Sequence, residues 1–72
     1  MKLKNAPEGK GYIINSIATN DAELDAFLFS LGCYPGEEII VVSRLKGGCI
    51  VYIKDGRYSI DNQLADAITV AA

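Results

Sequence analysis

The sequence predicts a mainly β protein: a small, strongly curved antiparallel β-barrel of about five strands, with one early α-helix and a short C-terminal helical turn. Three observations predict it. Short runs rich in β-branched residues recur along the chain, glycine-containing turns separate the central runs, and one early stretch has the apolar spacing of a helix. So few short strands do not make a sandwich, whereas closure into a barrel removes exposed strand edges.

Length and composition limit the classes of protein that the chain can be. Its 72 residues predict a single domain, residues 1–72, with a thin core, because a chain this small buries only about 60% of its unfolded surface. Half of the residues are hydrophobic and the net charge is −2, which favours a globular domain over a disordered one. The seven basic residues are dispersed among nine acidic ones, so we expect no nucleic-acid partner.

The ends and the apolar runs predict a cytoplasmic protein. Runs such as Ile39 to Val42 are far shorter than the ~20 residues of a spanning helix, so we expect no direct membrane insertion. The first seven residues lack the apolar core of a secretory signal. The one local basic group, Lys2, Lys4 and Lys10, flanks the expected start of the fold, and we interpret it as a solvated terminus.

The helix is expected from Asn20 to Leu31. We expect Asn20 to cap it, with the carboxylate of Glu23 reaching back to the cap and Asp21 adding negative charge in the first turn. Gly32 should end it in a left-handed conformation. The apolar stripe that should face the core has helical spacing and contains Leu24, Phe27, Leu28 and Leu31.

The flanking strands are expected at Tyr12 to Ile17 and Glu37 to Leu45. In the first, apolar residues lie on both faces, as in a strand covered on both sides or in a closed barrel. In the second, the odd-numbered residues from Ile39 to Leu45 should face the core, while Ile40 and Val42 look outward or pack under a loop.

Two turns and a final cap complete the chain. Lys46-Gly47-Gly48 should form a hairpin through positive φ angles at the glycines, and Asp55-Gly56 should form a tight one between Cys49–Lys54 and Arg57–Ile60. Both alternating sets of residues 49–53 are apolar, so the buried face of that strand stays open. Asp61 should cap a helical turn over 62–67, followed by a short strand over 68–70.

The residues predict no catalytic site, no cofactor and no metal site. Structural zinc takes four Cys or His ligands, and the chain has two cysteines, Cys33 and Cys49, and no histidine. We expect both to be free, packed thiols, with low reactivity for Cys33 because it follows a helix C-terminus. The one adjacent acidic pair, Glu37-Glu38, points to opposite faces of a strand and makes poor joint ligands. An adventitious transition-metal ion on the surface stays open.

The chain resembles the FeoA family, ferrous iron transport protein A. The resemblance lies in the helix end Leu28 to Gly32, the turn Pro35-Gly36, the strand Ile39 to Val42 and the close Ala65 to Val70. It covers nearly the whole chain. The sequence departs from the family pattern at two places: Phe27 stands where the family often has arginine, and Ile60-Asp61 stands where it often has leucine-arginine. Both changes remove a positive charge.

This resemblance implies an SH3-like barrel that acts in ferrous-iron uptake. It implies a cytoplasmic accessory protein, held at the inner membrane only through its partner, that binds and modulates the cytoplasmic part of a membrane ferrous-iron transporter with a GTP-binding domain. We expect a monomer or weak homo-oligomer. The alternative is a stand-alone SH3-like domain related to those of metal-dependent repressors, acting in regulation by protein binding.

Aromatic residues are the candidates for partner contact. Phe29 points away from the apolar stripe of its helix, where either a partner or a neighbouring loop could cover it. Tyr34 lies near the same helix end, and Tyr52 is a weaker addition. Interfaces are often anchored by aromatic rings, because one ring buries a large area at small entropic cost, although each ring could instead belong to the core.

Overall fold

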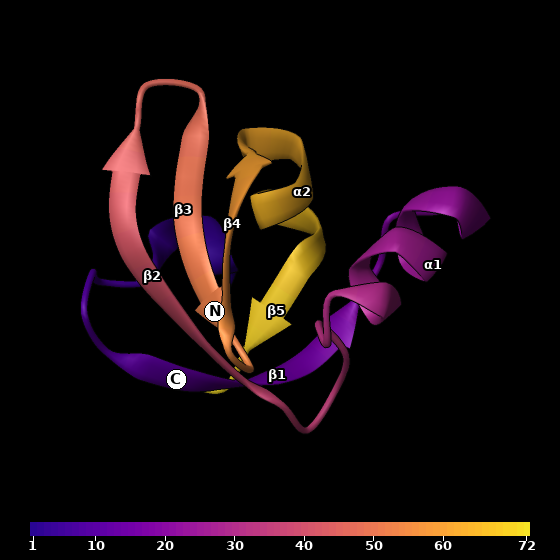
Figure 1. The fold of residues 1–72 in the computed structure, drawn as a ribbon, viewed down its shortest axis with the longest axis horizontal. Coiled ribbons are helices and arrows are strands. Elements are labelled where there is room, and N and C mark those ends of the chain that lie inside the picture. The colour runs from indigo at the N-terminus through magenta and orange to yellow at the C-terminus, as the bar shows by residue number, and fades with distance from the viewer.

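The computed structural model describes all residues, 1–72, and has five strands and two α-helices (Figure 1). This confirms the mainly β class, the early helix and the C-terminal helical turn. The elements, in chain order, are η1 (Leu3–Asn5), β1 (Gly11–Ile17), α1 (Ala22–Ser30), β2 (Glu38–Leu45), β3 (Gly48–Ile53), β4 (Gly56–Asp61), α2 (Asn62–Ala67) and β5 (Ile68–Val70).

The strands form one antiparallel sheet in the order β4-β3-β2-β1-β5. β1 joins its two parts, because its first half pairs with β2 and its second half with β5. The sheet curls strongly, but β4 and β5 do not pair, so it stays open and the predicted closed barrel is wrong in this detail. The reason is α2: it lies between the two edge strands and packs against both, with Ala65 fully buried (Figure 1).

The core lies inside the curled sheet. The buried face of β3, which the sequence left open, carries Cys49, Val51 and Ile53, while Tyr52 faces outward. On β1, the expected cover on both faces is wrong, since Ile13 is 45% exposed. The core side chains are Leu3, Ala6, Tyr12, Ile14, Leu28, Cys33, Ile39, Val41, Cys49, Val51, Ile53, Ile60, Ala65, Ile68 and Val70.

β2 follows the predicted alternation only in its first half. Ile39 and Val41 are buried as predicted. An irregularity in the pairing with β3 between Val41 and Ser43 then shifts the register, so Ser43 is only half-buried and Leu45 is 48% exposed. A bulge of this kind turns the following side chains to a new direction, and alternation alone does not reveal it.

The N-terminal segment belongs to the fold: Lys2, Lys4 and Lys10 are exposed, as expected for a solvated basic group, but residues between them pack into the core. Leu3 and Ala6 are buried, and their carbonyl oxygens both accept hydrogen bonds from the Arg44 guanidinium. Lys4 forms an ion pair with Asp66 on α2, at 3.2 Å between Nζ and Oδ1. The segment is therefore tied to both β2 and α2.

Both hairpins form where predicted, but their turns differ in detail from the prediction. Ile53 pairs with Gly56, so the loop of the β3–β4 hairpin is Lys54-Asp55, with a positive φ of 55° at Lys54. In the β2–β3 hairpin, neither Gly47 nor Gly48 has a positive φ. Gly48 is needed for another reason: a Cβ there would lie 2.8 Å from the Cα of Asp61 on β4.

The caps of the two α-helices were predicted with mixed success. Asp61 caps α2 as predicted, because its Oδ1 accepts a hydrogen bond from the Leu64 amide at 2.8 Å. On α1 the predicted cap is wrong by one residue. Asp21 Oδ1 accepts from the amides of Glu23 and Leu24 at 2.9 and 3.3 Å, while Asn20 adopts a left-handed φ of 59° just before it.

Candidate protein-binding surface

α1 stands out from the curled sheet and buries little of itself (Figure 1). Its one buried side chain is Leu28, while Phe27 is 51% exposed and Phe29 is 66% exposed. The predicted core stripe is therefore wrong at Phe27, because the helix meets the fold only along a narrow line. A helix of nine residues is too short to be stable alone, so its ends must hold it in place.

The C-terminal end of α1 is fixed by a Schellman motif. The amide of Cys33 donates to the carbonyl of Leu28 at 2.9 Å, and the amide of Gly32 donates to the carbonyl of Phe29 at 3.0 Å. Gly32 takes the left-handed φ of 87° that was predicted for it. Leu28 and Cys33, the apolar pair of the motif, are both buried. Phe29 is thus held on the opposite, outer side.

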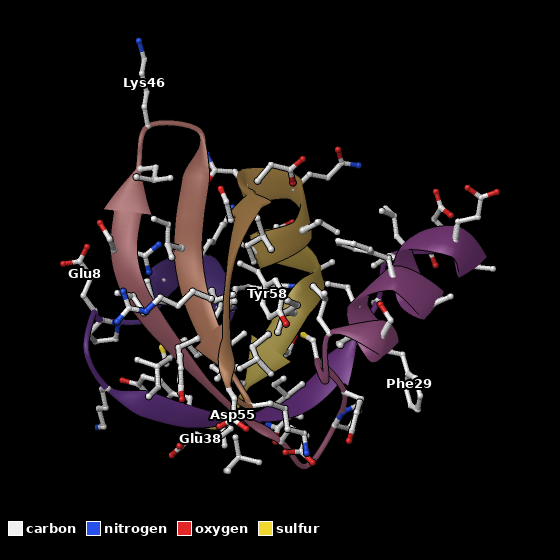
Figure 2. The ribbon with its side chains drawn as sticks, viewed as in Figure 1. Glu8, Phe29, Glu38, Lys46, Asp55 and Tyr58 are labelled. Atoms are coloured by element: carbon white, nitrogen blue, oxygen red, sulfur yellow. The ribbon has the colours of Figure 1, made fainter.

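The structure brings together two of the three predicted contact residues. The rings of Phe29 and Tyr34 lie 4.9 Å apart between centroids and are tilted by 33°. Figure 2 shows Phe29 at the end of α1, pointing away from the sheet. Tyr52 lies elsewhere, on the outer face of β3 opposite Ile40 and Arg57, and is 37% exposed. Whether any of the three touches a partner stays a prediction.

Lys54 contacts the Tyr34 ring of this pair, and sequence reasoning missed it. Its Nζ lies 2.9 Å from Glu37 Oε1 and 5.6 Å from the centroid of the Tyr34 ring. Hydrogen bonds to Glu37 and then Tyr34 raise the pKa of its ammonium group. Its stem passes Gly32 so closely that a Cβ there would lie 2.6 Å from Lys54 Cγ. No local sequence signal marks this contact, because it depends on the loop position of Lys54.

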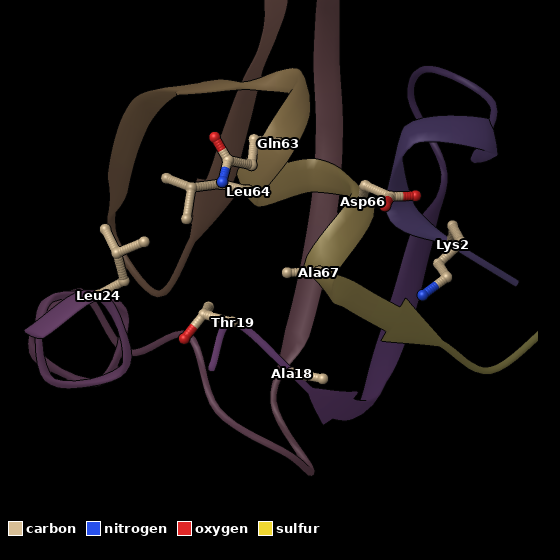
Figure 3. Close-up of a pocket in the computed structure, with 8 residues that line it drawn as sticks. All are labelled: Lys2, Ala18, Thr19, Leu24, Gln63, Leu64, Asp66 and Ala67. Atoms are coloured by element: carbon tan, nitrogen blue, oxygen red, sulfur yellow. The ribbon is translucent and has the colours of Figure 1, made fainter. Parts of the chain in front are cut away.

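Two clefts flank α1. One, of about 180 Å³, lies beside the helix end and is lined by Ile17, Asp25, Phe29, Cys33, Tyr34 and Pro35. The other, of about 190 Å³, separates α1 from α2. Figure 3 shows Leu24 of α1 and Leu64 of α2 on its two sides. The helix therefore presents a ridge with a hollow on each side, a shape suited to a protein partner.

Both cysteines are free and buried. Burial raises the pKa of the Cys33 thiol to about 11, so it is protonated at neutral pH. Burial also raises the pKa of Cys49, against a smaller lowering by the charge of Arg44. The low reactivity expected for Cys33 thus has a second cause, the surrounding apolar core. No three Cys, Asp or Glu side chains lie close enough together to hold a metal ion.

The acidic pair at the start of β2 divides as predicted. Glu37 is half-buried and turned towards Lys54, whereas Glu38 is exposed beside Gly11 of β1.

Neither helix has the length and apolar character required to cross a bilayer.

Comparison with known proteins identifies the family. Residues 1–72 match the FeoA domain. The chain belongs to the FeoA family. The resemblance seen in its motifs is therefore confirmed, and the family is implicated in ferrous iron transport. A search of curated proteins found no match.

Solved structures share this fold. The chain superposes on an iron uptake regulatory protein, FeoA, with a TM-score of 0.85 and 25% identity, covering 97% of this chain and 93% of that one. The superposition on iron(II) transport protein A from Clostridium thermocellum has a TM-score of 0.87 and 28% identity, and it covers 97% of this chain and 44% of that one. The superposition on a manganese-dependent transcriptional repressor has a TM-score of 0.89 and 20% identity, and it covers 100% of this chain and 41% of that one.

A zinc complex of Stenotrophomonas maltophilia FeoA is also similar, with a TM-score of 0.83 and 23% identity over 99% of this chain and 89% of that one. That protein is described as a procaryotic SH3 domain protein, which agrees with the SH3-like fold expected here.

Proposed function

We propose that this FeoA protein is a cytoplasmic accessory protein of bacterial ferrous-iron uptake. It binds the cytoplasmic part of a membrane ferrous-iron transporter that carries a GTP-binding domain, and it modulates transport without carrying iron and without catalysis. It reaches the inner membrane only through this partner, and it acts as a monomer or weak homo-oligomer.

The observation that carries the proposal is the exposure of Phe29. This ring is 66% exposed and stacks on Tyr34 at the end of a helix that is itself largely uncovered. Lys54 and the Schellman motif hold the ring and its neighbour in place, so little ordering remains to be done on binding. An exposed ring packed against a half-buried one is typical of an interface anchor.

Binding and iron uptake test the proposal together. The soluble cytoplasmic part of the transporter should bind the protein in a titration, and deletion of the gene should change ferrous-iron uptake by cells. Uptake should return when the deleted gene is supplied again. If the transporter part does not bind and deletion leaves uptake unchanged, the proposal fails.

A regulatory domain is the second candidate function. It is supported by the similarity to the manganese-dependent repressor, whose chain this protein matches over 41% of its length. This chain has no DNA-recognition helix, so it would act through a separate DNA reader. A reader protein that binds it, together with metal-dependent changes in transcription on its deletion, would favour this function over the first.

A further inference from the structure

The cleft beside the end of α1 combines aromatic walls with a single charge. Its volume is about 180 Å³, and Ile17, Cys33 and Pro35 supply apolar surface while Phe29 and Tyr34 supply rings. Asp25 is the one ionisable carboxylate among the lining residues. Such a lining favours a ligand that is flat or apolar along its length and positive at its tip.

Asp25 has no cationic partner within the protein. It accepts one hydrogen bond, from the Thr19 hydroxyl at 2.5 Å. The two ion pairs of the protein join other groups, Lys4 with Asp66 and Lys54 with Glu37. The sequence between Lys10 and Arg44 contains no lysine or arginine. Asp25 is exposed and no cation of this protein pairs with it, so its charge is available to a cation from another molecule.

One ring of the aromatic pair, Tyr34, already binds a cation of the protein itself. Lys54 Nζ lies 5.6 Å from the centre of the Tyr34 ring, which is within the range of a cation–π interaction. Its charge is matched by Glu37 at 2.9 Å, so it leaves the charge of Asp25 unopposed. The ring of Phe29 is 66% exposed and has no cation of its own.

We propose that this cleft binds an arginine side chain from an apolar segment of the transporter's cytoplasmic part. The inference rests on the proposed function and names the chemistry of the partner. A guanidinium group stacks flat on an aromatic ring and donates N–H groups to a carboxylate, and a lysine ammonium does only the second well. The arginine stem would lie along the apolar walls.

A matched pair of variants tests the charge in the full-length protein. Asp25→Asn keeps the acceptor for Thr19 and removes the charge, and it should weaken binding of the transporter's cytoplasmic part by about tenfold or more. Glu23→Gln removes an exposed charge on the same helix outside the cleft, and its affinity should stay within about twofold of wild type. Equal affinities for Asp25→Asn and wild type would overturn the inference.

A second measurement separates this inference from the proposed function. A short peptide with one arginine between leucines is titrated into the ¹⁵N-labelled protein, and the same peptide with neutral citrulline is the control. The arginine peptide should shift the amide signals of Asp25, Phe29 and Tyr34, and the Asp25→Asn variant should lose the shifts. Shifts elsewhere, or equal shifts with citrulline, would overturn the inference. If the transporter part fails to bind but the arginine peptide shifts the signals of the cleft, the proposed function fails and the cleft still binds arginine, from a different partner.

Discussion

Gly32 is the residue on which the presentation of Phe29 depends most. It takes a φ of 87° at the end of α1, and its missing Cβ leaves room for the stem of Lys54. The lack of a Cβ at Gly32 therefore has two effects: it allows the helix to end there, and it lets Lys54 pass to reach Tyr34. A helix-stop pattern in the sequence reveals the first effect only.

Replacement of Gly32 by alanine should lower the free energy of unfolding by about 1–2 kcal/mol, because an L-residue is strained at this φ. Urea unfolding measures the change. Gly47→Ala is the matched control, since φ is not positive there and a Cβ would meet nothing within 4 Å. Its effect should stay within about 0.5 kcal/mol. Equal losses for the two variants would contradict this account of Gly32.

Cys33 makes stability depend on pH in the alkaline range. Its pKa is about 11 in the folded protein against an ordinary value of 9.0, so only the unfolded chain loses this proton between those values. The contribution of the protonated Cys33 thiol to the free energy of unfolding is fully present below pH 9.0. It is lost as pH rises towards 11, by up to about 1.4 kcal/mol per pH unit.

Unfolding titrations between pH 8 and 11 check this prediction. Cys33→Ala should remove part of the alkaline loss, while the remaining part, to which Cys49 contributes in the same direction, persists. A wild-type protein whose stability does not fall over this range would show that Cys33 is not held in an apolar site.

At the scale of the element, α1 is held by its two ends rather than by a broad buried face. Asp21→Ala should remove the N-cap and cost about 1 kcal/mol, whereas Asp21→Asn should keep the cap and cost little. Because α1 buries only Leu28, we expect the loss to appear first as faster hydrogen exchange in 25–30. Equal exchange in the two variants would mean that Asp21 does not cap the helix.

The elements were predictable where local signals decide them. The helix stop at Gly32, the cap at Asp61 and the buried pair Ile39 and Val41 all follow from short-range chemistry and were predicted correctly. The register shift after Val41 was not, because a bulge depends on the pairing with β3. The predicted cap at Asn20 failed since two adjacent residues can both cap, and only the chain's entry path selects Asp21.

The candidate site was predictable only in part. Phe29 stood out because its position in the helix turns it from the apolar stripe, and Tyr34 because it lies near the helix end. Lys54 and Asp25 gave no such signal, as the first comes from a distant hairpin and the second resembles any surface carboxylate. Contacts of this kind depend on the tertiary fold.

At the scale of the whole molecule, the N-terminal segment completes a core that the sheet leaves open. Met1 exchanges backbone hydrogen bonds with Val70 of β5, and the Arg44 guanidinium binds the carbonyl oxygens of Leu3 and Ala6. With the helix α2, this segment covers the gap that a closed barrel would have filled with a strand pair. The first residues are therefore part of the fold rather than a tail.

Leu3→Ala should lower the free energy of unfolding by about 2–5 kcal/mol, the usual cost of truncating a fully buried leucine. Leu45→Ala is the same substitution at a position that is 48% exposed, and it should cost far less. Thermal unfolding by circular dichroism compares the two. A Leu3 variant as stable as the Leu45 variant would show that the segment is not part of the core in solution.

The claim that α1 presents a rigid aromatic anchor for the transporter is tested most directly by Phe29→Ala, with its melting temperature and its affinity measured side by side. We predict an unchanged melting temperature, because a ring that is 66% exposed adds little to the core, and a binding constant for the transporter's cytoplasmic part weakened about tenfold or more. A variant that melts several degrees lower, or that binds as tightly as wild type, would contradict the account.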